Sequence, residues 1–153
     1  MKFQSTKVFD GYSTVFRQWR ADGTHCQFLH GYGISFKIIF EGDLDHRNWV
    51  WDFGHAKRSK YLIEGMTPKV WMDYLLDHTT LIAEDDPYMD TFKQMDKDGI
   101  IQLRILPYTG CERFAEYLYN KLSPWVESDS KGKVKIVQVE VKEHDKNSAI
   151  YGE

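Results

Sequence analysis

The chain has 153 residues, a length that suits a single domain over residues 1–153. Hydrophobic residues make up 42% and charged residues 28%, which excludes a disordered or fibrous class. The net charge of −3 argues against nucleic acid or an anionic membrane as a partner, and two cysteines are too few for a secreted disulfide framework. Since no apolar run is long enough to span a membrane, we expect a cytoplasmic protein.

In chain order, the first clear element is a strand at residues 33–41, and we expect one other strand before it. Its apolar side chains alternate with mostly polar ones, the period of two that indicates a strand with one buried face. The apolar positions are Ile34, Phe36, Ile38 and Phe40.

Two helices follow. Thr67 and Pro68 predict an N-cap and a proline in the first turn of a helix that ends at Asp77 and His78. The second helix is expected to begin near Cys111 and to be stopped by Pro124, soon after the last residue of its apolar stripe. Their apolar stripes are Val70, Trp71, Tyr74 and Leu75 in the first helix, and Phe114, Ala115, Leu118 and Leu122 in the second.

Two further strands complete the pattern. Residues 100–106 form a short apolar run, and residues 133–142 alternate with a slip in phase at Ile136 and Val137. A bulge at that point explains the slip, as does burial on both faces. Strands grouped at both ends with helices between them favour an α+β fold with an antiparallel sheet.

Several side chains could carry chemistry, and each also has a purely structural interpretation. Cys26 lies in a turn-like stretch beside His25, where a thiolate can be stabilised, or it fills a small apolar space. Asp77 and His78 could form an acid–base pair, or His78 could simply cap the helix, since neighbours on a helix do not face one another.

Three more candidates stand near strand or helix ends. His30 is a metal ligand or an ordinary strand-end histidine, and Tyr32 shares its face of the strand. Glu143 is either solvated or points into a pocket, where its two oxygens can accept parallel N–H bonds from a planar heterocycle. Glu112 is most simply a favourable charge at the start of the second helix.

Together these segments resemble the 6-pyruvoyltetrahydropterin and 6-carboxytetrahydropterin synthase family. Five segments match family motifs in the correct order. They are CQFLHGY at residues 26–32, WVWDFGHAK at 49–57, LDHTTL at 76–81, PYTGCER at 107–113, and EHDKN at 143–147 followed by Tyr151.

The resemblance implies the tunnelling fold (T-fold), with a four-stranded antiparallel sheet, two helices on one face and the order ββααββ. It implies a trimer or hexamer of identical chains with sites between subunits. It also implies a carbon–oxygen or carbon–carbon lyase that moves protons on the side chain of 7,8-dihydroneopterin triphosphate. The pathway stays open between biopterin, deazapurines such as queuosine, and a folate branch, as does a pyruvoyl or a carboxy product.

The resemblance also assigns roles. Cys26 would transfer protons, assisted by Asp77 and His78 of a neighbouring subunit. The substrate-binding residues would be Glu143, which anchors the pterin ring, with Thr109 and Glu112 near it.

The expected cofactor is zinc, which the family holds with three histidines. Phe16 and Tyr32 stand at two of these positions, so only His30 remains, with His25 as a possible substitute and Tyr32 as a possible phenolate ligand. Two functions therefore compete. The acid–base residues favour an active lyase, whereas the lost ligands favour a pterin- or purine-binding protein with little lyase activity, because Lewis-acid help would be missing.

Overall fold

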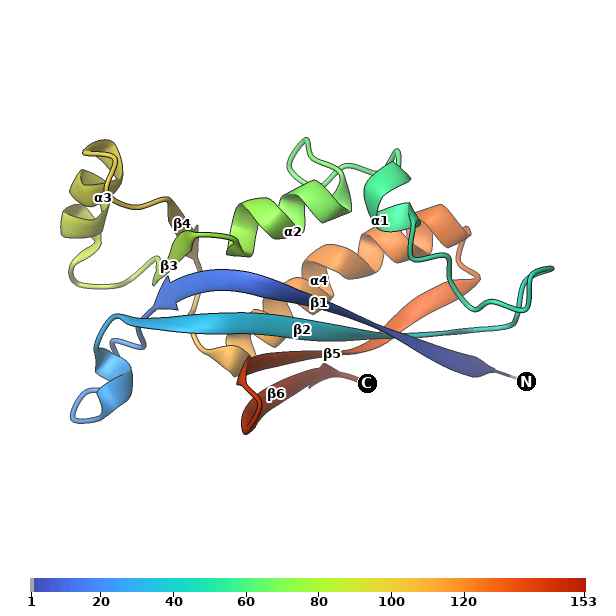
Figure 1. The fold of residues 1–153 in the computed structure, drawn as a ribbon, viewed down its shortest axis with the longest axis horizontal. Coiled ribbons are helices and arrows are strands. Elements are labelled where there is room, and N and C mark those ends of the chain that lie inside the picture. The colour runs from blue at the N-terminus through green and yellow to red at the C-terminus, as the bar shows by residue number, and fades with distance from the viewer. Residues whose placement is uncertain (1) are drawn as a thin grey trace.

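The computed structural model describes residues 2–153 as an α+β fold, in which one six-stranded sheet carries helices on one face (Figure 1). The strands are β1 Phe3–Phe16, β2 His30–Gly42, β3 Thr79–Ala83, β4 Leu103–Leu106, β5 Val134–His144 and β6 Asn147–Gly152. The helices are α1 His55–Arg58, α2 Pro68–Leu76, α3 Met89–Lys97 and α4 Cys111–Ser130, with a 3-10 turn at His25–Gln27. No helix among residues 2–153 has both the length and the apolar character that crossing a membrane requires.

The sheet is mixed and has the order β4-β3-β1-β2-β5-β6. The strands β1, β2, β5 and β6 are antiparallel, while β3 pairs in parallel with β1 and β4 in parallel with β3. The α+β class is therefore confirmed, but the expected four-stranded antiparallel sheet, two helices and order ββααββ are wrong. The extra strand β3 starts soon after α2, and all five of its residues are buried, so this short run belongs to the sheet.

The strand patterns themselves are confirmed. In β2, the side chains from Ile34 to Phe40 alternate between buried and half-buried. In β5, Gln138 pairs with Ile39 but Ile136 pairs with Phe40, so the register skips Val137. The slip in hydrophobic phase therefore marks a bulge, the first of the two explanations.

The helix ends give one confirmation and one correction. The Thr67 hydroxyl accepts a hydrogen bond from the Val70 N–H at 3.4 Å, and α2 begins at Pro68 as expected. By contrast, α4 does not stop at Pro124 but continues to Ser130. An interior proline costs about 3 kcal/mol. The next residue, Trp125, is 1% exposed, and burying such a side chain contributes a similar amount, which offsets the loss.

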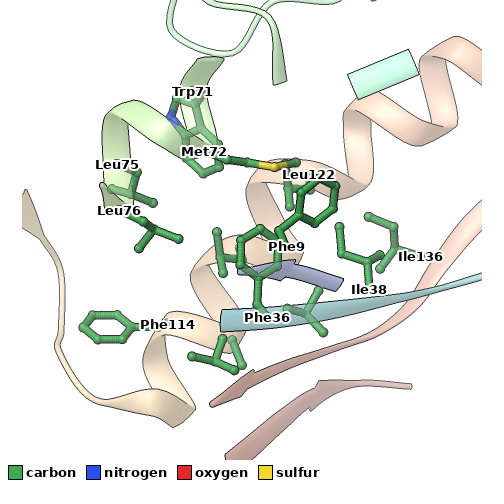
Figure 2. Close-up of a cluster of buried hydrophobic side chains, with 14 of the residues drawn as sticks. Phe9, Phe36, Ile38, Trp71, Met72, Leu75, Leu76, Phe114, Leu122 and Ile136 are labelled. Carbon is green, nitrogen blue, oxygen red and sulfur yellow. The ribbon is translucent and has the colours of Figure 1, made fainter. Parts of the chain in front are cut away.

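The core lies between the sheet and the apolar faces of α2 and α4 (Figure 2). Trp71 and Met72 of α2, Leu122 of α4 and Phe36 of β2 are all at most 1% exposed. This packing holds α4 across the sheet, and the start of α4 lies beside the end of β5 (Figure 1). The strand and helix ends gathered there form the site.

Candidate active site

The candidate site lies at the end of the sheet where β1 ends and β2 begins. Phe16, the last residue of β1, pairs with His30, the first residue of β2. On the other side of β2, Ser35 pairs with Lys142, so Glu143 follows at the end of β5. The turn containing Cys26 joins β1 to β2 at this same end (Figure 1).

An aromatic cluster occupies the positions expected for the zinc ligands. The rings of Phe16 and Tyr32 stack with centroids 4.4 Å apart and an interplanar angle of 20°. Phe114 of α4 contacts Phe16 edge-on at 4.8 Å, and His30 contacts Tyr32 edge-on at 4.6 Å. Since Phe16 is 1% exposed, the ring belongs to the core and cannot be exchanged for solvent or a ligand without a rearrangement.

The residues present do not fit a three-histidine zinc site. His25 and His30 are exposed, and in the described range 2–153 no three His, Cys, Asp or Glu side chains lie close enough together to hold a metal ion. Burial and the negative charge of Glu143 raise the pKa of the Tyr32 phenol, which disfavours the phenolate that would bind a metal. A catalytic zinc needs three protein ligands, and this donor set falls short of that number.

Glu143 faces a second cysteine. Its side chain is half-buried, and its carboxylate forms a hydrogen bond with the Cys111 thiol at the start of α4. Burial and the charge of Glu143 raise the pKa of Cys111, so this thiol stays protonated and acts as a hydrogen-bond donor. Glu143 is therefore not simply solvated, and its role as an anchor in a pocket stays a prediction.

Cys26 lies in the 3-10 turn and is exposed, so it does not fill an apolar space in this chain. Its N–H donates to the Thr24 hydroxyl at 3.2 Å, and its carbonyl accepts from the Gln18 N–H at 2.8 Å. These backbone bonds fix the turn and leave the sulfur accessible. Cys26 is also close enough to Tyr32 for its charge to act on the phenol, as Glu143 does.

Asp77 and His78 form a pair despite being neighbours in sequence. The helix ends at Leu76, and His78 adopts a left-handed backbone conformation with φ of 58°. This turn brings His78 Nδ1 to 2.9 Å from Asp77 Oδ1. The pair hydrogen-bonds to no part of Cys26 within residues 2–153 of this one chain.

The two remaining candidates differ. The Thr109 hydroxyl is half-buried and donates to the Arg17 carbonyl at 2.6 Å, which holds the segment before α4 against the end of β1. Glu112 is exposed in the first turn of α4, as its simpler interpretation expects. The residue that faces Glu143 is Cys111. The pattern contained this signal, because Cys111 precedes Phe114 and Ala115 at helical spacing, which puts it on their buried face.

A family model described as 6-pyruvoyl tetrahydropterin synthase matches residues 3–153. The chain belongs to this family. The resemblance inferred from the motifs is thereby confirmed. No curated protein sequence matches the chain.

Solved structures agree with the family in fold. The uncharacterized protein WS1659 from Wolinella succinogenes has a TM-score of 0.80 at 20% identity, over 99% of this chain and 98% of its own. The 6-pyruvoyl tetrahydropterin synthase of Caenorhabditis elegans has a TM-score of 0.65 at 18% sequence identity. The match covers 100% of this chain and 96% of the other. The 6-pyruvoyltetrahydropterin synthase of Plasmodium vivax has a TM-score of 0.63 at 15% sequence identity. The match covers 99% of this chain and 98% of the other. At these identities the likeness concerns the fold alone.

Proposed function

We propose that the chain is a lyase of the tetrahydropterin synthase type, acting on 7,8-dihydroneopterin triphosphate by proton transfer on the substrate side chain. One observation carries this proposal: the turn that holds Cys26 and the end of β5 that holds Glu143 meet at one end of the sheet, where both residues lie close enough to Tyr32 to raise the pKa of its phenol. A ring anchor and a proton-transferring group close to one another are what this reaction requires.

Glu143 would hold the ring. Its carboxylate can accept two parallel N–H bonds from an aminopyrimidinone edge, and a charged acceptor makes such bonds strong. The Cys111 thiol, as a donor to the same carboxylate, orients it without competing for ring protons. Tyr32, stacked on Phe16, adds an aromatic wall beside the anchor.

Cys26 would move the proton with help from Asp77 and His78. A proton on His78 Nδ1 is accepted by Asp77 at 2.9 Å, which leaves Nε2 to take up or release a proton. Because the pair makes no bond to Cys26 in the described chain, a complete site requires the pair from a second copy.

The open edges of the sheet support such an assembly. On its outer side β1 pairs with β3 only from Thr14 to Phe16, and β6 has a neighbour on one side only. Unpaired strand edges are templates for another chain. Large apolar side chains are exposed at these edges, namely Phe3 and Val8 on β1 and Ile150 and Tyr151 on β6. We therefore infer a homo-oligomer, a trimer or hexamer, joined edge to edge.

A second candidate function is binding of a pterin or purine ring with little lyase activity. The stack of Phe16 on Tyr32 favours it, because these rings replace two of the expected zinc ligands and with them the Lewis acid that would stabilise a developing enolate. This alternative keeps the ring anchor and the assembly but removes the turnover.

The two functions are separated by assaying purified oligomer with 7,8-dihydroneopterin triphosphate, beside Cys26→Ala and Asp77→Asn variants. The lyase proposal expects product from the unmodified chain and at least a hundredfold loss in Cys26→Ala. Tight ring binding without any product would overturn the lyase and support the binding protein. Neither binding nor product would overturn both.

A further inference from the structure

A hollow of about 470 Å³ lies apart from the candidate active site, against β1, the segment that leads into α1, and the start of α2. Its lining is strongly basic. The basic residues are Lys7, Lys57, Arg58 and Lys69, and the one carboxylate lining it in the described chain is that of Asp10. This concentration of positive charge stands out because the whole chain has a net charge of −3. None of the residues proposed for the active site lines the hollow, whereas one lining residue, Val8, stands on the β1 edge that we infer joins another copy.

Two of the four cations are held in place by carboxylates. Arg58 lies 2.9 Å from Asp52, and Lys69 lies 2.6 Å from Asp73, which also accepts the Tyr12 hydroxyl at 2.9 Å. These bonds fix where the two positive groups point, so they are already oriented at the rim before a ligand arrives.

The other two cations have no such partner. In residues 2–153, neither Lys7 nor Lys57 lies within ion-pair distance of a carboxylate. The Lys7 ammonium lies 5.9 Å from the ring centroids of both Phe9 and Phe53, which are part of the same wall. Positive charge that is uncompensated and flanked by apolar walls focuses a field that attracts anions.

We infer that this hollow is a binding site for an oligophosphate, either free or carried by a small molecule. A phosphate chain supplies several negative charges and many acceptor oxygens. These suit the two unpaired lysines, together with the N–H groups that Arg58 and Lys69 do not use on their carboxylates, better than a single carboxylate does. The volume of about 470 Å³ is in the range of small-molecule sites. The source is either the triphosphate of the proposed substrate or a separate phosphorylated ligand.

The test is calorimetric titration of the intact protein with inorganic tripolyphosphate, in buffer of low ionic strength. The matched variants are Lys7→Gln/Lys57→Gln, which removes the two unpaired charges, and Lys93→Gln/Lys97→Gln, which removes two charges from α3 on another part of the fold (Figure 1). We expect binding by the unmodified protein, at least tenfold weaker binding in the first variant, and an unchanged affinity in the control. Binding that is absent, or equally weak in both variants, would overturn the site.

Sedimentation of the same proteins excludes another occupant. If a second copy covers the hollow, Lys7→Gln/Lys57→Gln dissociates the oligomer and tripolyphosphate does not bind the unmodified protein, which would overturn the inference. The source of the phosphate follows from the lyase assay. A raised KM for the triphosphate substrate in this variant assigns the hollow to the substrate, while an unchanged KM with weakened tripolyphosphate binding assigns it to a separate ligand.

Discussion

Replacing Phe16 and Tyr32 by histidine should create the zinc site that the chain lacks. Phe16 pairs with His30 across β1 and β2, and Tyr32 lies on the same face within ring contact of both. The variant Phe16→His/Tyr32→His would therefore bring three imidazoles to one spot, enough for a catalytic-type zinc.

The cost and the gain can both be estimated. Phe16 is 1% exposed and packs on Tyr32 and Phe114, so losing its ring should cost about 3 kcal/mol, the lower end for a buried phenylalanine. Zinc at a thousandfold excess over its Kd returns about 4 kcal/mol. For a chain of this size, the metal-free variant should melt about 6–12 °C below the unmodified protein, and zinc should raise its Tm by about 8–16 °C.

Thermal unfolding with and without zinc, together with metal analysis after dialysis, measures both effects. We expect one zinc per chain in the variant and no shift in the unmodified protein. A shift as large in the unmodified protein, or a stoichiometric zinc that it retains through dialysis, would refute the reasoning that the aromatic stack replaces the metal. A folded variant that binds no zinc would refute the placement of the three side chains.

Three further predictions follow from the site and the core. Cys26→Ala should abolish turnover but leave the oligomer intact, because the side chain is exposed; dissociation on sedimentation would contradict this. Iodoacetamide at pH 8 should label exposed Cys26 and spare Cys111, which is 5% exposed and whose pKa is raised; mass spectrometry that finds Cys111 labelled in the native state would contradict the contact with Glu143. The free energy of unfolding should fall as the pH rises above about 9, because burial raises the pKa of Cys111 and of Tyr12 while the unfolded chain ionises near the ordinary values of 9.0 and 10.0. Each group then contributes a loss of up to about 1.4 kcal/mol per pH unit, and urea unfolding that gives equal stability at pH 8 and pH 10.5 would exclude it.

The fold was predictable wherever hydrophobic periodicity was strong. The alternation in β2 led directly to a strand, and the slip at Val137 left two explanations, of which the structure shows the bulge. In contrast, α3 was missed because its nine residues bury only Phe92 and show little apolar pattern. The end of α4 was missed because a local rule about Pro124 was applied without the tertiary burial of Trp125, which opposes it.

The motifs selected candidate site residues, but the geometry of those residues could not be predicted from the sequence. For Asp77 and His78 the sequence left an acid–base pair and a helix-capping histidine open, because neighbours on a helix do not face one another. The two side chains meet because His78 takes a left-handed conformation that no sequence rule requires. Glu112 was singled out for its charge, whereas the helical spacing of the buried face selects Cys111. The position of a residue within the helical repeat therefore decided which way its side chain points, whereas its charge or functional group did not.

Glu143 as the ring anchor is tested most directly by the affinity of the purified protein for neopterin, measured by fluorescence titration. The variant Glu143→Gln replaces a charged acceptor pair by an amide with a mismatched donor, and Glu127→Gln is the matched control at an exposed position near the other end of α4. We expect Glu143→Gln to bind at least tenfold more weakly and Glu127→Gln to bind as the unmodified protein does. Equal affinity in all three proteins would contradict the placement of the pterin site at Glu143.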